Sequence, residues 1–243
     1  MSPYALETRH LMLPGGVAKV PDLQLEPGDC LLVIADEPGR ARRLSRCLAG
    51  LEPPESGHIE LAATGAPLPA TWLEPGIEPL ASLSVRENLL LPAWHHGLPA
   101  AHVEERLALL YPDDRLLADD RLLPERLDAM EQRRLVLARA LLLGPVLLSL
   151  HHPLAGLPAR QRLALADWLR GCARQLGTVL LMSLEEPLLG AHIPAPLLLI
   201  DTHDSALFEH WQALLDSPLP AAQDIRQELS RLCSPLREKK TRP

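Results

Sequence analysis

The chain has 243 residues, a formal net charge of −7 and an apolar content of 47%, and aromatic residues make up only 3% of it. This length suits one large domain, and the apolar content is enough for a core built from Leu, Ala and Val. A negative charge with few aromatic side chains argues against a nucleic-acid-binding face, so we expect no nucleic-acid partner. The four cysteines are scattered along the chain, and we expect reduced, buried thiols rather than a disulfide or zinc set.

The N-terminal part of the chain reads as strands followed by a strand, a turn and a helix. Residues 4–13 and 17–25 alternate as two antiparallel strands around Pro14-Gly15-Gly16. Residues 30–34 form a short apolar run typical of a buried strand, and residues 40–48 have a helix-forming composition that ends at Gly50. Another short strand is expected at residues 58–61.

The middle and C-terminal parts alternate between helices and apolar strands. Ser84 is predicted to cap a helix, with Glu87 at the capping-box position, and Trp94 to Gly97 to form a linker. His95-His96 is not expected to bind a metal, because adjacent side chains point in different directions. The sequence predicts further helices at residues 101–110, 160–176 and 206–215, and strands at residues 146–150, 178–183 and 197–200. It also predicts an arginine-rich helix with Leu135, Ala138 and Leu142 on one face.

Several short motifs are similar to those of ABC-transporter ATPases when they are taken together. Leu-Ala-Gly-Leu at residues 48–51 comes at the end of the helix expected at residues 40–48, and in the family the same motif follows the P-loop helix. The other motifs are Val-Arg-Glu-Asn at 85–88, Ala-Arg-Ala-Leu at 138–141 and Pro-Leu-Ala-Gly-Leu at 153–157. The resemblance covers residues 5–229. It implies an α/β fold with an ABC-ATPase-like P-loop core, which is a mixed sheet with flanking helices, an N-terminal antiparallel β subdomain and a helical subdomain.

The same resemblance implies how the chain is divided. A single domain is expected at residues 1–230, with the helical subdomain inserted at about residues 78–143 and a C-terminal extension at about residues 205–233. Residues 234–243 are polar and cationic and are expected to form a tail. No apolar run reaches the length of a membrane span and no signal peptide is visible, so we expect a soluble, cytoplasmic protein.

The positions that carry chemistry in that family hold other residues here. The glycines, lysine and hydroxyl of the P-loop fall on Ala35, Pro38, Gly39, Arg40, Ala41 and Arg42, and the signature falls on Leu127, Asp128, Ala129, Met130 and Glu131. The magnesium aspartate and catalytic glutamate of the Walker B strand fall on His151 and His152, the D-loop aspartate on Pro158, and the switch histidine on Leu184. The Q-loop glutamine should lie near Glu74 or Pro75.

These replacements lead to the expectation that the chain is not an enzyme. A P-loop lysine neutralises phosphates, and paired acidic groups hold magnesium and polarise water, so their loss predicts no ATP hydrolysis. We therefore expect no cofactor, weak or no binding of ATP and magnesium, and no metal site. Arg40, Arg42 and Arg43 keep the loop positive, which leaves both a solvated basic turn and an anion site open.

The resemblance implies a non-catalytic subunit of a membrane transporter, peripheral on the cytoplasmic face of the inner membrane. It would dock on an integral-membrane permease around Glu74, Leu83, Val85 and Arg86, and would pair as a homodimer or as a heterodimer with an ATPase subunit. Residues 213–229 resemble the C-terminal extension of ATPase subunits from Mla-type, MCE-linked phospholipid transporters, which lies on the neighbouring subunit and implies lipid transport. The alternative is a soluble scaffold or regulator that has this fold and no permease. A third alternative, an enzyme with an arginine-based nucleotide loop, is disfavoured by the acidic Asp128 and Glu131.

Overall fold

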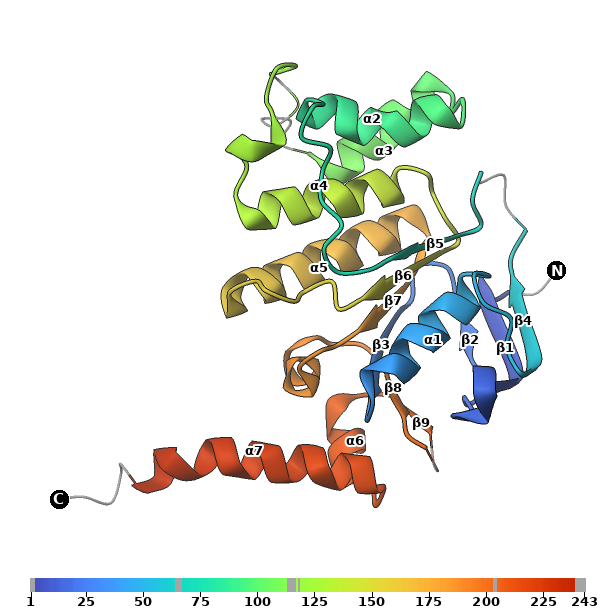
Figure 1. Cartoon of the computed structure of the whole chain (residues 1–243), viewed down its shortest axis with the longest axis vertical. Helices are drawn as coiled ribbons and strands as arrows, with labels where there is room; N and C mark the ends of the chain where they lie inside the picture. The colour runs from blue at the N-terminus through green and yellow to red at the C-terminus, as the bar shows by residue number, and fades with distance from the viewer. Residues whose placement is uncertain (1–2, 64–66, 113–116, 118, 203–204, 239–243) are drawn as a thin grey trace.

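The computed structural model describes residues 3–63, 67–112, 117, 119–202 and 205–238 (Figure 1). The polar tail expected at residues 234–243 lies outside this part of the chain from residue 239 onward. Two sheets and the helices packed on them make up the fold. None of the described helices is long and apolar enough to cross a membrane.

The larger sheet has six strands in the order β5-β6-β7-β3-β8-β9. Its members are β5 (Ala70–Leu73), β6 (Leu147–His151), β7 (Val179–Ser183), β3 (Cys30–Ala35), β8 (Leu197–Ile200) and β9 (Ala206–Phe208). All neighbouring pairs are parallel except β8 and β9, which are antiparallel. The strand β3 therefore lies between β7 and β8, although both partners come much later in the sequence.

Both faces of β3 are covered, which explains its unbroken apolar sequence. Leu32 and Ile34 belong to the larger core, on the side of the helices α4 (Ala129–Leu141) and α5 (Ala159–Leu176). Leu31 and Val33 belong to a second core, beneath α1 (Pro38–Leu48). Successive side chains of a strand point to opposite faces, and parallel sheets are usually buried on both. The predicted strand at residues 30–34 is confirmed.

The smaller sheet is antiparallel, with the order β2-β1-β4. Its strands are β1 (Leu6–Met12), β2 (Gln24–Leu25) and β4 (Ser56–Leu61), and a short 3-10 turn, η1 (Pro14–Gly16), follows β1. The strand predicted at residues 17–25 is reduced to β2 and an isolated bridge between Met12 and Lys19. This sheet and α1 enclose the second core.

The remaining helices build up in layers on the other side of the large sheet. In Figure 1, α5 (Ala159–Leu176) lies next to the sheet and α4 (Ala129–Leu141) above it, and α2 (Val85–His95) and α3 (Ala100–Leu110) are farthest away. The short turns η2 (Pro124–Arg126) and η3 (Pro187–His192) join these elements. The chain ends in α6 (Trp211–Asp216) and α7 (Pro220–Glu238), and α7 extends away from the body toward the C-terminus.

Local sequence signals explain where two helices begin. The predicted capping box at α2 is confirmed: the amide of Glu87 donates to the Ser84 hydroxyl at 3.2 Å, and the amide of Ser84 donates to the Glu87 carboxylate at 2.7 Å. An equivalent capping box joins Asp128 and Glu131 at the start of α4, at 2.8 and 2.9 Å. Each box satisfies amide groups that the first turn of a helix leaves unpaired.

Three secondary-structure predictions need correction. The first helix begins at Pro38 rather than at Arg40, because proline is well suited to the first helical position. The helix predicted at residues 206–215 is divided, since Ala206–Phe208 pairs with β8 as β9 and only Trp211–Asp216 is helical. Trp94 and His95 belong to α2 rather than to a linker.

Candidate functional site

The carboxyl ends of the parallel strands bring most of the predicted motif positions to one edge of the large sheet. In open parallel sheets this edge is where ligands usually bind. Asp36 follows β3, Glu74 follows β5, His152 follows β6 and Leu184 follows β7. The positions expected for the P-loop, Walker B and switch motifs therefore lie at the same edge of the sheet.

The connection between β3 and α1 is short and acidic. Only Asp36 and Glu37 separate the end of β3 from the start of α1. The residues that would form a wide phosphate loop are instead part of the helix, and Ala41 is 2% exposed in the core beneath α1. Pro38 has no amide hydrogen, and the amide of Arg40 already donates to the Glu37 carbonyl at 3.0 Å, so this turn offers few free backbone donors to a phosphate.

The arginines of this edge already bind protein groups. Arg40 forms an ion pair with Asp36 and a longer one with Glu37 at 3.5 Å, and Arg42 forms an ion pair with Glu74. The Arg43 guanidinium donates to the Pro14 carbonyl at 3.2 Å. Of the two alternatives for this basic turn, the structure favours an internally paired, partly solvated one over an open anion site.

The two histidines after β6 are joined through one serine hydroxyl. The Ser183 hydroxyl lies 2.9 Å from His151 Nδ1 and accepts the backbone amide of His152 at 3.1 Å. The imidazole centroids are 4.0 Å apart, and His152 has a left-handed φ of 48°, which is unusual for a residue other than glycine. In the described part of the chain, no three His, Cys, Asp or Glu side chains are grouped so that they could hold a metal ion.

Burial keeps these imidazoles neutral. Desolvation, helped by the neighbouring His152, lowers the pKa of His151 to about 4. Desolvation also lowers the pKa of His152, although the carboxylate of Glu185 acts in the opposite direction. At neutral pH the end of β6 therefore carries no positive charge from either imidazole.

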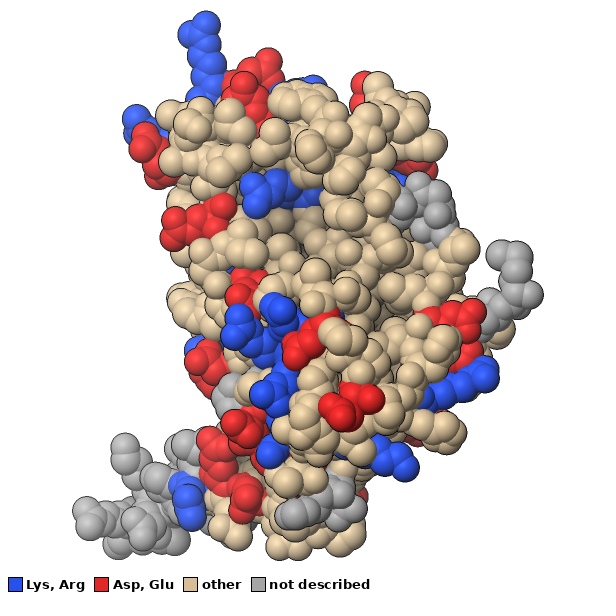
Figure 2. Space-filling view, turned by 45° about the vertical axis from the view of Figure 1, so that its right-hand side comes forward, with Lys and Arg blue, Asp and Glu red and all other residues tan. Residues whose placement is uncertain are grey.

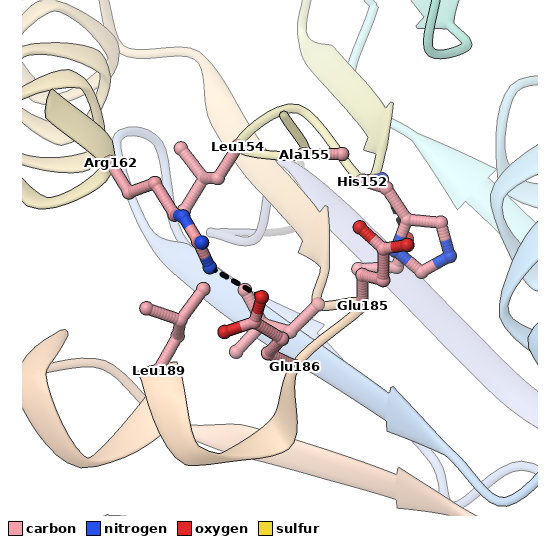
Figure 3. Close-up of a pocket in the computed structure, with 9 residues that line it drawn as sticks. His152, Leu154, Ala155, Arg162, Glu185, Glu186 and Leu189 are labelled. Carbon is pink, nitrogen blue, oxygen red and sulfur yellow. Dashed lines mark hydrogen bonds and ion pairs between the residues drawn. The ribbon is translucent and has the colours of Figure 1, made fainter. Parts of the chain in front are cut away.

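A small cavity lies beside His152 (Figure 3). Arg162, from α5, crosses it to form an ion pair with Glu186 at 2.7 Å, while Glu185 lies next to His152. The cavity volume is about 10 Å³, which is close to the smallest that holds one water molecule. This cavity is too small for a nucleotide.

The signature and D-loop positions serve as helix starts. Asp128 caps α4, Leu127 before it is 7% exposed, and Pro158 caps α5 with a φ of −58°. Leu184, at the switch position, is 6% exposed and packs in the larger core. The amide groups at the start of α4 are thus satisfied by a carboxylate of the chain itself.

A second candidate site is a group of exposed apolar side chains on α2 and in the loop before it, here called the α2 face. It consists of four large apolar side chains that are 36 to 59% exposed: Ile77, Leu80, Leu91 and Trp94. Asn88, on the same helix, binds the backbone of Leu80 and so holds the preceding loop against α2. The C-terminal end of α2 points to the right in Figure 1, and Figure 2, in which that side comes forward, shows a hollow in the upper half that is mostly tan but has Lys or Arg atoms at its rim.

The predicted permease-binding residues have different environments. Val85 is 0% exposed and packs in the larger core, so it supports the α2 face from beneath and offers no contact to a partner. Leu83 is partly buried, Glu74 is paired with Arg42, and the exposed Arg86 lies 3.6 Å from Asp120. Sequence reasoning placed the docking groove at about residues 74–91, which includes Leu91 but not Trp94. The spacing i, i+4, i+7 from Glu87 places both side chains on one helical face. It also missed Ser183, which no local pattern marks.

Known proteins similar to this chain are ATP-binding proteins of transport systems. An aliphatic sulfonates import ATP-binding protein (SsuB 1) of Rhodococcus jostii is 32% identical over 168 residues, which are 67% of this chain and 64% of that protein. The lipoprotein-releasing system ATP-binding protein LolD of a Shewanella species is 25% identical over 79% of this chain and 88% of that protein. A Nod factor export ATP-binding protein I of Rhizobium etli is 28% identical over 65% of this chain, which spans only about half, 52%, of that protein. No family model matches the chain.

Solved structures show the same fold. CbiO1 of Clostridium perfringens, part of an ABC transporter complex, matches 97% of this chain and 100% of its own, with a TM-score of 0.73 and 14% identity. A putative metal-chelate type ABC transporter in an inward-facing conformation matches 85% of this chain with a TM-score of 0.68 and 17% identity. The predicted α/β fold of an ABC-ATPase domain is confirmed. The relatives are thus similar to this chain in sequence, and the solved structures share its fold.

Two predictions drawn from the motif positions are wrong. The chain was expected to be no enzyme and to use neither ATP nor magnesium, but its relatives are named ATP-binding proteins of import, export and release systems. The error lies in treating altered motif positions as decisive for the whole chain.

The described residues at the sheet edge nevertheless do not fit ATP and magnesium in the manner of a P-loop. The β3–α1 connection lacks the glycines and the lysine, its arginines are paired with carboxylates, and Ala41 is buried.

Proposed function

We propose that this chain is the ATP-binding subunit of an ABC-type membrane transporter, and that it docks through the α2 face on an integral-membrane permease. The observation that carries the docking proposal is the exposure of Leu91 and Trp94 on α2 and of Leu80 in the loop before it, at 36, 59 and 44%, next to a helix whose opposite side packs into the core. A large apolar patch on a soluble domain usually marks an interaction surface. The family of the chain and the absence of a spanning helix among its described residues agree with a separate membrane partner.

The nucleotide part of the proposal is supported by the names of the relatives, each of which is called an ATP-binding protein. The transporter would place the chain on the cytoplasmic face of the inner membrane. The substrate is proposed more narrowly as a lipid moved by an MCE-type system. That part is supported by α6 and α7, which follow the core as the C-terminal extension of such subunits does.

Pairing of two subunits is the third part of the proposal. In α7, Ala222 and Ile225 are buried against the body, while Leu229, one turn further on, is only partly buried. The helix extends away from its own domain (Figure 1), so its apolar stripe is available to a second ATP-binding subunit, either a copy of this chain or a different one.

The docking proposal is tested by purifying the tagged chain from detergent-solubilised native membranes and identifying what is bound. A polytopic membrane protein is expected with the wild-type chain and is expected to be lost with Leu91→Asp, which places a charge on the α2 face. Glu105→Lys, on the exposed side of α3, is the matched control. Recovery of soluble proteins alone would favour the scaffold alternative.

The nucleotide and pairing proposals need separate measurements on the same preparations. Binding of labelled ATP with magnesium is measured by equilibrium dialysis, and saturable binding is expected. The mass of the purified complex is measured by light scattering for the wild type and for Leu229→Asp, which is expected to reduce the number of ATP-binding subunits per complex. Absence of saturable ATP binding would overturn the nucleotide part without affecting the docking result.

A further inference from the structure

A groove lies where the smaller sheet meets the edge of the large one, and it is here called the β4–β5 groove. It has a volume of about 590 Å³ and is lined by the end of α1, the loop that follows α1, β4 and the start of β5. Its lining is mostly apolar and includes Leu51, Ile59 and Leu61, and Leu51 is 53% exposed. A space of this size suits a peptide segment or a small ligand. No residue of the α2 face lines the groove, so the two surfaces are separate.

One wall of the groove is an open strand edge. β4 is the last strand of the smaller sheet, on the right in Figure 1, and among the described residues it pairs only with β1. The amide of Ala62 donates to the Ala5 carbonyl at 2.9 Å, and in an antiparallel pair the residues that bond to the neighbouring strand alternate with those that do not. The backbone groups of Glu60 therefore face β1, and those of Ile59 and Leu61 point away from it.

A second wall is also an open edge. β5 is the last strand of the large sheet and, in the part of the chain that the structure describes, pairs only with β6. The Leu147 amide donates to the Pro69 carbonyl at 3.1 Å, so the backbone groups of Thr71 face β6 and those of Ala70 point outward. No described residue forms a hydrogen bond to the outward groups of either edge. Unpaired groups of this kind are a template for a further strand.

The sequence of β4 does not block such pairing. Proteins commonly place Lys or Pro on an open edge, whereas β4 is Ser-Gly-His-Ile-Glu-Leu. Ile59 and Leu61 are partly buried and pack against the second core, while His58 and Glu60 between and before them are exposed. A strand added to this edge would therefore have one face turned toward apolar side chains and one face in water.

The face in water carries a negative charge that an added strand can balance. Glu60 lies opposite Glu7 in the register of β1 and β4, and within the described residues it forms no ion pair. Arg9 attracts Glu60, but it already donates to Glu7 at 2.8 Å. Like charges opposite each other in a sheet are unfavourable, so a Lys or Arg placed beside Glu60 is complementary to this edge.

We infer that the edge of β4 accepts an extended segment of another protein as an additional strand. Apolar residues of the segment enter the β4–β5 groove beside Leu51, and a Lys or Arg on its other face lies next to Glu60. Backbone hydrogen bonds to Ile59 and Leu61 supply affinity, and the apolar and charged positions supply selectivity, as is general for strand addition. This inference goes beyond the proposed function, because it gives the chain a second partner that does not depend on the permease.

Two other occupants fit this edge less well. A second copy of the chain would bring together two β4 strands that contain no Lys or Arg, and β5, Ala-Thr-Trp-Leu, contains none either. Glu60 would then remain without a cation. An apolar small molecule would fill the groove but would leave the outward backbone groups of Ile59 and Leu61 to water.

The first experiment measures peptide binding to the full-length chain by fluorescence anisotropy. The probe is a labelled peptide of about eight residues that alternates Val and Lys, which is long enough for a typical strand. A peptide that alternates Val and Glu and a scrambled peptide with the Val-Lys composition are the comparisons. Saturable binding is expected for the alternating Val-Lys peptide alone. Absence of this binding, or equal binding of the scrambled peptide, overturns the inference.

Backbone methylation of the same probe tests strand addition directly. In an added strand every second amide faces β4, so N-methyl groups on one alternate set of residues are expected to abolish binding and those on the other set to leave it unchanged. Amide hydrogen exchange at Ile59 and Leu61 is expected to become slower when the probe binds, whereas Glu60 is already bonded to β1 and should not change. Equal effects of the two methylation patterns overturn the inference.

Variants locate the binding edge. Glu60→Lys is expected to weaken binding of the Val-Lys probe about fivefold, because it replaces a favourable cross-strand pair by a repulsive one. Ile59→Pro removes an outward amide that the ladder with β1 does not use, and it is expected to abolish binding. Glu105→Lys changes the net charge as Glu60→Lys does, on the exposed side of α3, and should bind as the wild type. Urea unfolding shows whether each variant is folded, and Glu60→Lys decides the test if Ile59→Pro is not.

The outcomes are distinguishable from those of the transporter proposal. Equal weakening by Glu60→Lys and Glu105→Lys would assign the binding to the net charge of the chain and overturn the inference. A benzophenone amino acid at Leu51, irradiated in cells, is expected to join a segment of another protein that alternates apolar residues and contains Lys or Arg. A crosslink to lipid or to a second copy of the chain overturns the inference in favour of that occupant. Recovery of the membrane partner is expected to be the same for Glu60→Lys and the wild type, whatever the result for the β4 edge.

Discussion

The side-chain amide of Asn88 binds the backbone of Leu80 in both directions. Its oxygen accepts the Leu80 amide at 2.8 Å, and its nitrogen donates to the Leu80 carbonyl at 3.0 Å. The same nitrogen lies 3.0 Å from the carbonyl oxygens of Leu83 and Ser84. One buried side chain thus fixes the loop that supplies half of the α2 face.

Replacing Asn88 should loosen that loop and destabilise the fold. Asn88 is 0% exposed, and Asn88→Ala leaves several backbone groups without their partner. We expect the free energy of unfolding to fall by about 2–3 kcal/mol. Urea unfolding measures this change, and amide hydrogen exchange at Leu80 should become faster. If Asn88→Ala lowers the free energy of unfolding by no more than the exposed Glu105→Ala does, the hydrogen bonds of Asn88 to the loop do not stabilise the fold.

The exposed and buried members of the docking region should respond differently to truncation. Trp94→Ala removes a side chain that is 59% exposed, so we expect the free energy of unfolding to change by less than about 0.5 kcal/mol. Recovery of the membrane partner is expected to fall about tenfold, since exposed aromatic residues commonly dominate binding.

Val85→Ala should show the opposite behaviour. Val85 is 0% exposed, and the cavity left by its truncation is expected to lower the free energy of unfolding by about 2 kcal/mol. Urea unfolding and membrane-partner recovery are measured in parallel on both variants. Equal stability losses for Val85→Ala and Trp94→Ala would contradict the burial on which the docking surface is defined.

The buried imidazole of His151 predicts loss of stability in mild acid. Its pKa is lowered to about 4 in the folded chain by desolvation, and an unfolded histidine titrates near ~6.5. The unfolded state therefore binds more protons between these values, so stability is full above about pH 6.5 and falls as the pH decreases toward 4.

The size of this effect depends on the groups that face the imidazole. His152 and Arg42 oppose its protonation, Glu74 favours it, and the Ser183 hydroxyl is bound to it. We expect a loss of about 1–2 kcal/mol from this group between pH 7.5 and pH 5. Urea unfolding at both pH values should show a smaller difference in His151→Asn, whereas the exposed His58→Asn should behave as the wild type. An unchanged difference in His151→Asn would assign the effect to other groups.

Gly57 is required where β4 approaches β1. It has a φ of +95°, and a Cβ at this position would lie 2.5 Å from the carbonyl oxygen of His10. Gly57→Ala is expected to lower the free energy of unfolding by about 2–4 kcal/mol, because backbone atoms must move to relieve the clash. Gly50 has a φ of +71° with no other atom within 4 Å of the added Cβ, so Gly50→Ala should cost only about 1 kcal/mol. If urea unfolding shows equal losses of unfolding free energy for Gly57→Ala and Gly50→Ala, the positive φ alone, and not the contact with β1, accounts for the two losses.

Local signals in the sequence predicted much of the fold. The capping box of Ser84 and Glu87 follows from a fixed spacing of three residues, and the strand β3 follows from an unbroken apolar run between turn residues. The capping box and the strand both depend on residues that are close together in the sequence, so both can be predicted from it. Residues 206–208 were predicted as helix because their pairing with β8 is a tertiary contact that no local pattern reveals.

The candidate sites were only partly predictable for the same reason. The motif positions at the sheet edge could be located by spacing, but the hydroxyl of Ser183 reaches His151 across neighbouring strands and could not be inferred. Val85 was expected at the docking surface because of its place in a motif, whereas helix geometry turns it inward and presents Leu91 and Trp94. Burial of a given helical residue depends on which side the rest of the fold covers.

The central place of β3 also affects how the protein is made. Roughly 145 residues separate the end of β3 from the start of β7, and β8 follows later still. At a synthesis rate of ~5–20 residues per second, the apolar strand leaves the ribosome about 7–30 seconds before either neighbour exists. Throughout that interval both edges of β3 lack their final partners, although α1 and the smaller sheet, which cover one of its faces, are already made. The newborn chain is thus exposed to aggregation during translation, and its yield in cells should depend on chaperones that bind short apolar segments.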